Sequence, residues 1–277
     1  MTAFSAKSLP IFLTAVLLAA PSAARAQQSF IQKWQARATA TQAAQPHWVT
    51  PLATVTPRLE QEFRADFDRQ LTSAGTTTWT YGSGKGLELI PARRIELLFN
   101  MPSYIQHNSA AKDGFGDTTL LMKYRFYVRN EQHGNAIITA FFGGTIPTGS
   151  YSNGSTDASL SPTLAVGKGF GHFDAQSTAG VTLPVANTDK LGRTVAWNTA
   201  FQYRAGPHFF PEVEFNTTFY EGGPHDGKIQ NFVTPGLVGH WKLRHRLGVT
   251  LGAGMQIATS TYHAENHNLI LSARIPF

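Results

Sequence analysis

Charged residues occupy every second position of one short stretch, RLEQEFRADF, at residues 58–67. The charged residues are Arg58, Glu60, Glu62, Arg64 and Asp66, and the residues between them are mainly apolar. Successive side chains of a β-strand point to opposite faces, so a strand here would place five charges on one face. The core of a water-soluble sandwich would not take them, whereas a polar lumen would, with opposite charges pairing across it.

The same alternation recurs along the chain in about twelve segments. They lie near residues 55–67, 77–90, 94–105, 116–128, 135–146, 157–168, 172–184, 194–204, 210–220, 230–241, 246–258 and 267–277. Segments of this length suit a tilted crossing of a bilayer, and the connections between them are alternately short and long, as in outer-membrane barrels. Charged residues make up only 14% of the chain, which fits a wall with one lipid-facing side. The sequence therefore predicts an all-β fold over residues 55–277: a closed, antiparallel, up-and-down transmembrane β-barrel of about twelve strands.

The beginning of the chain has the features of a secretory signal peptide. Residues 1–26 combine Lys7, an apolar run over residues 9–20 and an A-x-A cleavage site at residues 24–26. The run is too short for a membrane anchor, so we expect export and a bacterial outer-membrane location. Residues 27–54, rich in Ala and Gln, are expected to form a periplasmic N-terminal segment, and a linker, a short helix and a partial plug of the lumen all remain open.

The chain ends in a strand-like pattern, NLILSARIPF, with an aromatic residue at Phe277. A barrel must pair its last strand with its first so that no backbone edge meets hydrocarbon. Outer-membrane barrels typically end in an aromatic residue that the barrel assembly machinery reads. We therefore expect Phe277 to be an assembly signal.

Three motifs resemble a known family. GFGDTTLLMKYRF at residues 114–126, FFGGTIPTGSYSNG at residues 141–154 and DASLSPTLAVGKGFG at residues 157–171 resemble the outer-membrane family named for the meta-pathway of phenol degradation, over about residues 50–277. That family is distantly similar to the fatty-acid and aromatic-hydrocarbon channels. The resemblance implies a passive channel for small, apolar or aromatic solutes, and it leaves the solute open because the motif glycines and prolines serve turns.

The candidate functional residues are the charges that the alternation directs into the lumen. They are Arg58, Glu60, Glu62, Arg64, Asp66, Glu96, Lys123, Arg125, Arg204, Glu212, Glu214 and Arg274. Such charges either line a permeation path and set its selectivity or pair to fill and rigidify a narrow lumen. One lysine breaks the pattern, because Lys85 would face lipid at a cost of roughly 2–4 kcal/mol. The glycines around it predict a bulge that turns its side chain elsewhere.

No catalytic residue, metal site or cofactor is expected. SYSNG at residues 150–154 matches the phospholipase pattern His-x-Ser-Asn-Gly except for its histidine, so Ser152 lacks a base. HAENH places His263, Glu265 and His267 at alternate positions, which leaves metal binding open beside the reading as loop residues. GSGKG at residues 82–86 lacks the spacing of a phosphate loop. The chain has a net charge of +6, but its basic residues are interleaved with acidic residues instead of forming a block. This distribution argues against nucleic acid as a partner.

The expected partners are a small-molecule solute, outer-membrane lipid and lipopolysaccharide, and the assembly machinery. A monomer is expected. The sequence favours a channel for passive diffusion, and it leaves two alternatives: a blocked binding or structural barrel, and an outer-membrane lipid hydrolase.

Overall fold

The structure, a computed structural model, describes residues 30–277, except for the side chains of residues 83–85. The predicted signal peptide and residues 27–29 lie outside the described residues. The strands are β1 (Glu62–Thr72), β2 (Thr77–Ala92), β3 (Ile95–Asn100), β4 (Tyr104–His107), β5 (Gly114–Phe115), β6 (Thr118–Arg129), β7 (Ala136–Ile146), β8 (Ser159–Phe170), β9 (Phe173–Pro184), β10 (Arg193–Tyr203), β11 (Phe209–Glu221), β12 (Ile229–Arg244), β13 (Leu247–Ala258) and β14 (Glu265–Pro276). Short helical turns, η1 (Glu131–His133), α2 (Thr188–Leu191) and η2 (Gly223–His225), lie in connections.

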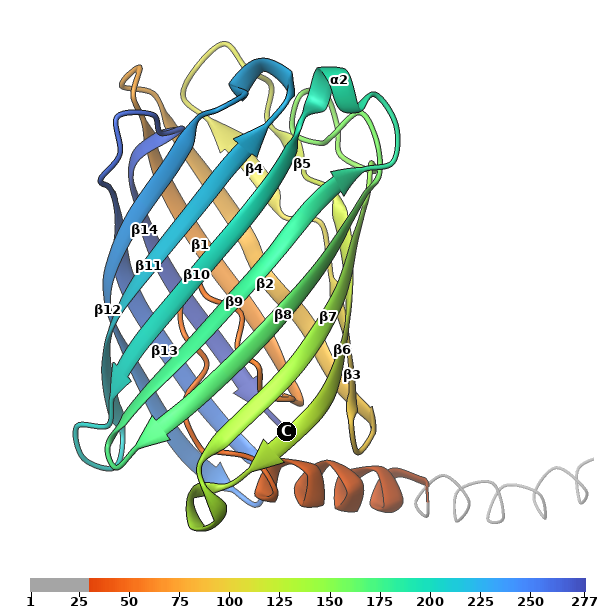
Figure 1. The fold of residues 1–277 in the computed structure, drawn as a ribbon, viewed down its shortest axis with the longest axis vertical. Coiled ribbons are helices and arrows are strands. Elements are labelled where there is room, and N and C mark those ends of the chain that lie inside the picture. Colours follow the sequence, from red (N-terminus) through yellow and green to blue (C-terminus); the bar gives the residue numbers. More distant parts are fainter. Residues whose placement is uncertain (1–29) are drawn as a thin grey trace, which may run out of the picture.

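The strands form a closed antiparallel barrel (Figure 1). β3 and β4 both pair with β2 and are successive parts of one wall strand, and β5 and β6 form the next, which gives a wall of twelve strands. β1 pairs with β2 on one side and with β14 on the other, from Glu62 opposite Pro276 to Thr72 opposite Glu265. The predicted fold class is confirmed. Closure leaves neither β1 nor β14 with an unpaired edge.

The two faces of the wall carry different side chains. On β6, Leu120, Met122 and Tyr124 are exposed on the outside, whereas the intervening Lys123 and Arg125 are buried inside. A sheet with an apolar outer face and charges on its inner face is stable only with lipid outside and a polar interior.

Eleven of the predicted segments coincide with wall strands to within three residues at each end. The exception is the first, which was expected at residues 55–67 and is observed as β1 at Glu62–Thr72. Residues before Glu62 are not part of the wall, so Arg58 and Glu60 do not lie on a strand. The prediction was wrong because a polar segment inside the lumen shows the same alternating charges as the inner face of a strand.

β2 contains the predicted bulge. Its pairing with β1 shifts register on both sides of Asp66, and Gly82 and Gly86 adopt φ values of +80° and +69°. A Cβ on Gly86 would also lie 2.3 Å from the carbonyl oxygen of Phe99, so this position requires glycine. The two shifts add up to two residues, so the side chains of β2 on either side of the bulge keep the same alternation between the outer and the inner face. The side chain of Lys85 lies outside the described residues.

The chain before β1 lies across one end of the barrel and then inside it. A helix over residues 30–43 crosses the end of the barrel at which the chain terminates, and the following residues rise into the lumen (Figure 1). Within residues 30–277, no helix is both long and apolar enough to cross a membrane. We call residues 44–61 the lumen segment.

The connections at the opposite end from the termini are long and are tied to one another. The side chain of Asp117, between β5 and β6, accepts hydrogen bonds from the backbone N–H of Gly149 (2.9 Å) and from the N–H and hydroxyl of Ser155 (both 2.7 Å). Partial desolvation raises the pKa of this carboxyl, but the hydrogen bonds from Ser155 and Gly149 outweigh it and lower the pKa below its ordinary value. Ionised Asp117 therefore fixes the loop of residues 147–158.

Acidification should release this loop. Because the pKa of Asp117 is lower in the folded loop, its stabilising effect is complete above the ordinary aspartate pKa of about 4 and is lost as the pH falls through the lowered value. Asp117→Asn should make the loop mobile at neutral pH. Limited proteolysis at residues 147–158, compared with Asp189→Asn, tests this. Equal cleavage of wild type and Asp117→Asn at pH 7 would contradict it.

Candidate functional site

The lumen segment is buried by the wall around it. Thr54 and Leu59 are fully buried, and Leu52 is 2% exposed. Buried backbone groups need hydrogen-bond partners, and this irregular segment finds its partners among the inward side chains of the strands. The inward charges are therefore engaged mainly with the chain's own N-terminal part.

Two arginines hold the carbonyl groups of the lumen segment. Arg274 on β14 donates hydrogen bonds to the carbonyl oxygens of Thr50 and Pro51, the latter at 2.9 Å. Arg64 on β1 donates to the carbonyl oxygen of Leu52 at 2.5 Å. Hydrogen bonds from a charged donor are about twice as strong as neutral ones, so these contacts fix residues 50–52 against one side of the wall.

Two glutamates hold the amide groups of the next residues. The carboxylate of Glu212 accepts from the N–H of Leu52 (3.0 Å), and that of Glu214 accepts from the N–H groups of Ala53 (2.8 Å) and Thr54 (2.5 Å). Both glutamates lie on β11, with side chains on the same face. The turn of the lumen segment is thus clamped between the arginines of β1 and β14 and the glutamates of β11.

A second group of charges lies where the lumen segment approaches β1. The ammonium of Lys123 is 2.9 Å from the Glu96 carboxylate and 3.9 Å from that of Glu88, and it donates to the carbonyl oxygen of Arg58 at 3.1 Å. Arg58 pairs with Glu60 at 3.1 Å. Because Lys123 and Glu96 are fully buried, removing the lysine leaves a buried Glu96 without its ion-pair partner.

Arg125 ties the lumen segment to the helix over residues 30–43. Its guanidinium donates to the carbonyl oxygen of Thr41 (3.2 Å) and to the side-chain oxygen of Gln45 (2.8 Å). Gln45 exchanges two hydrogen bonds with the backbone of Leu59, at 2.8 and 3.0 Å. The two ends of the lumen segment are therefore joined beside Arg125.

The structure places the twelve predicted lumen residues in three settings. Glu62, Arg64, Asp66, Glu96, Lys123, Arg125, Glu212, Glu214 and Arg274 are buried on the inner face of strands. Arg58 and Glu60 lie on the lumen segment. Arg204 has the expected parity and follows the last residue of β10, where it is exposed and lines an open cavity at the termini end of the lumen. The alternation therefore continues one residue past the end of the strand.

Sequence reasoning missed several buried polar residues that contact the lumen segment or its charges. They are Glu88, Thr139, Gln176 and Gln202. The Thr139 hydroxyl donates to the carbonyl oxygen of Pro57 (2.6 Å), and Gln176 donates to that of Val49 (3.0 Å). Uncharged polar residues on the inward parity were the available signal for three of them, and Glu88 was hidden by the irregular pattern around Lys85.

An open cavity of about 480 Å³ lies at the termini end of the lumen. Its lining includes charged residues, among them Arg58, Glu60, Arg204 and Arg246, and it reaches Val49 and Phe210. The Arg246 guanidinium donates to the carbonyl oxygen of Phe277 at 3.1 and 3.0 Å, and the N–H of Phe277 donates to that of Gln61 at 3.1 Å. The last residue of the chain is thus bound at the rim of this cavity, and its role in assembly stays a prediction.

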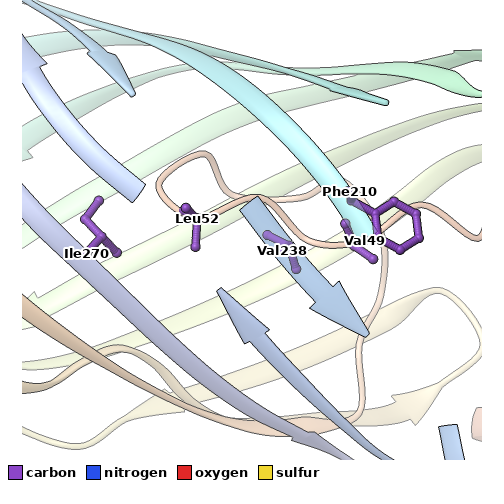
Figure 2. Close-up of a cluster of buried hydrophobic side chains, with 5 residues drawn as sticks. All are labelled: Val49, Leu52, Phe210, Val238 and Ile270. Carbon is purple, nitrogen blue, oxygen red and sulfur yellow. The ribbon is translucent and has the colours of Figure 1, made fainter. Parts of the chain in front are cut away.

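An apolar cluster interrupts the polar lumen (Figure 2). We use this name for Val49, Leu52, Phe210, Val238 and Ile270. Val49 and Leu52 belong to the lumen segment, and the other three come from β11, β12 and β14. Apolar side chains therefore meet the lumen segment next to the residues that clamp its backbone.

The SYSNG motif lies in a loop at the end opposite the termini, and HAENH spans the end of such a loop and the first residues of β14. Within residues 30–277, no three His, Cys, Asp or Glu side chains are placed to hold a metal ion. The ring nitrogens of His263 contact the carbonyl oxygen of Ser260 and the side-chain oxygen of Asn266, both at 2.9 Å. In SYSNG, the Asn153 oxygen contacts the His107 ring at 2.7 Å and the Ser150 hydroxyl accepts from the Phe115 N–H at 2.8 Å. Both motifs thus serve loop structure.

Two solved structures of outer-membrane proteins are similar to this chain, and the first shows the same fold. An outer membrane channel from Pseudomonas putida F1 is 15% identical, with a TM-score of 0.57 and coverage of 83% of this chain and 100% of that chain. A NanC porin is 8% identical, with a TM-score of 0.48 and coverage of 77% and 98%. No curated protein matches the sequence. The model of a family described as "Putative MetA-pathway of phenol degradation" matches residues 54–271. The resemblance found in the motifs is confirmed, and the chain belongs to this family.

Proposed function

We propose that the protein is an outer-membrane channel for the passive diffusion of small, apolar or aromatic molecules. The observation that carries the proposal is a closed barrel with a lipid-compatible outside and a polar lumen, occupied by a segment that is not part of the wall. The fold it shares with a channel and its family membership both support this function. We also propose that the wall reaches the membrane as a monomer through the assembly machinery, with the long loops facing lipopolysaccharide.

Transport requires the lumen segment to move out of its position in the lumen. Its backbone is held by hydrogen bonds to side chains, among them Arg274 and Glu214, and such bonds exchange for water at a modest net cost of about 1–3 kcal/mol each. The segment is therefore a gate that can leave its place without unfolding the wall.

A blocked binding or structural barrel is the second candidate, because the lumen segment is so thoroughly buried. The chain has no cysteine, so a pair introduced at Leu52 and Gly254 distinguishes the two candidates. A Cβ at Gly254 would lie 2.6 Å from the Leu52 side chain, which places the two thiols within reach of each other.

The experiment compares the Leu52→Cys/Gly254→Cys protein, oxidised and reduced, in planar bilayers and in liposomes swelling in phenol or xylenol. We expect conductance and swelling in the reduced protein, and their loss on oxidation. Wild-type protein treated identically is the control. No conductance or swelling in either redox state, or in wild type, would favour the blocked barrel.

A further inference from the structure

The apolar cluster lies among polar residues on the inner face of the barrel wall. On β11, β12 and β14 the inward face turns apolar at Phe210, Val238 and Ile270, which are each 6% exposed or less. The inward neighbours of Phe210 and Ile270 along their strands are polar, Glu212, Asn268 and Ser272. A lumen that only had to hold a polar segment would not need three large apolar side chains together.

The wall next to these residues is hollowed to the shape of one side chain. Gly236 on β12 and Gly252 and Gly254 on β13 face Leu52, and a Cβ on any of the three would lie 2.6 Å from a terminal methyl carbon of Leu52. The absence of side chains at these positions makes a depression that the isobutyl group fills. Without Leu52, the wall would present an apolar pocket.

Polar groups surround this pocket. Arg64 and Arg274 donate to carbonyl oxygens at residues 50–52, and Glu212 accepts from the Leu52 N–H. If the lumen segment withdraws, these groups lose those backbone partners. A molecule with an apolar body and one hydroxyl or carbonyl group can fill the pocket and also replace one of these hydrogen bonds.

The pocket is next to an open route. The cavity of about 480 Å³ at the termini end is lined by Val49 and Phe210 of the apolar cluster and by Arg274. A solute in this cavity already touches two members of the cluster, and Leu52 of the same cluster fills the depression in the wall.

We infer that the apolar cluster is the binding site of the channel for a single-ring aromatic molecule that carries one hydroxyl group, and that Leu52 occupies this site as a built-in competitor. The inference rests on the proposed function and names its substrate class. An engineered cavity of about 150 Å³ lined by apolar side chains in another protein binds benzene, and removal of the Leu52 side chain would leave a cavity that is likewise lined by apolar side chains and glycines.

Calorimetric titration of detergent-solubilised full-length protein with phenol tests the inference. Leu52→Ala removes the competitor and should bind phenol about tenfold more tightly than wild type, because the site no longer has to be vacated first. Leu59→Ala is the matched control: Leu59 is buried in the same lumen segment, but it packs with Ala38 and Ile90, so its truncation loosens the segment without emptying the apolar cluster and should raise phenol affinity less than Leu52→Ala does.

Refilling the pocket from the wall gives the second test. Leu52→Ala/Gly252→Leu should lose the gain in affinity, and benzene should bind Leu52→Ala more weakly than phenol does. Heat-dependent gel mobility checks that each barrel is folded. If folded Leu52→Ala gains no affinity over wild type, gains no more than Leu59→Ala, or keeps its gain in the refilled variant, the inference is overturned. Equal binding of benzene would overturn the role of the hydroxyl.

The two proposals fail separately. Tight phenol binding by Leu52→Ala together with absent conductance supports the site and contradicts the channel. Conductance in the reduced cysteine variant together with no gain in phenol binding supports the channel and contradicts this site.

Discussion

Glu214→Ala should convert a mostly closed barrel into a mostly open one. The carboxylate accepts hydrogen bonds from the N–H groups of Ala53 and Thr54, and hydrogen bonds to a charged group contribute about 1.5–3 kcal/mol each. Loss of both favours withdrawal of the lumen segment by about 3 kcal/mol, which corresponds to roughly a hundredfold change in the ratio of open to closed states. Single-channel recording in planar bilayers measures the open probability directly.

Glu221→Ala is the control for this variant, since Glu221 is the last residue of the same strand and is exposed. It should leave the open probability at the wild-type value. A folded Glu214→Ala protein with unchanged gating would show that the lumen segment does not control conduction, and that solutes pass beside it or not at all.

The largest effect on stability is expected for Lys123→Met. The lysine is fully buried, and the change removes the ammonium that pairs with the buried Glu96 carboxylate at 2.9 Å. Removing one partner of a buried ion pair costs about 3–5 kcal/mol. Urea unfolding in detergent, followed by tryptophan fluorescence, measures the loss.

Two further variants show whether charge is the cause. Lys168→Met removes an exposed lysine from β8 and should change stability little, because exposed charge pairs contribute about 0–1 kcal/mol. Lys123→Met/Glu96→Gln also removes the carboxylate that lost its ion-pair partner and should recover part of the lost stability. No recovery would mean that packing of the lysine stem, and not charge, dominates at this position.

The barrel could be predicted because two solvents act on every wall strand. Lipid outside and a polar lumen inside impose alternation on each strand. The type of a residue therefore indicates which face it lies on, as for Lys123 on the inner face and Tyr124 on the outer face. Strand ends were harder to place. Arg204 keeps the alternation beyond the end of β10, and nothing in the local pattern marks where the hydrogen-bonded ladder stops.

The lumen segment could not be predicted as such, because its environment resembles that of an inner strand face. Arg58 and Glu60 alternate with Leu59 just as Glu62 and Arg64 alternate with Phe63. Its anchoring was also hidden. Glu214 binds backbone N–H groups, which every residue except proline carries, so no feature of the side chains at residues 53 and 54 identifies their partner.

The distance along the chain between the lumen segment and its anchors has a consequence for biogenesis. Leu52 and Glu212 are 160 residues apart, and Thr50 and Arg274 are 224 residues apart. Contacts between such remote positions form late during folding. The lumen segment precedes every wall strand in the chain, so it is synthesised well before the strands that anchor it. If β1 paired with β14 before the lumen segment had entered the lumen, the segment would remain outside the closed barrel.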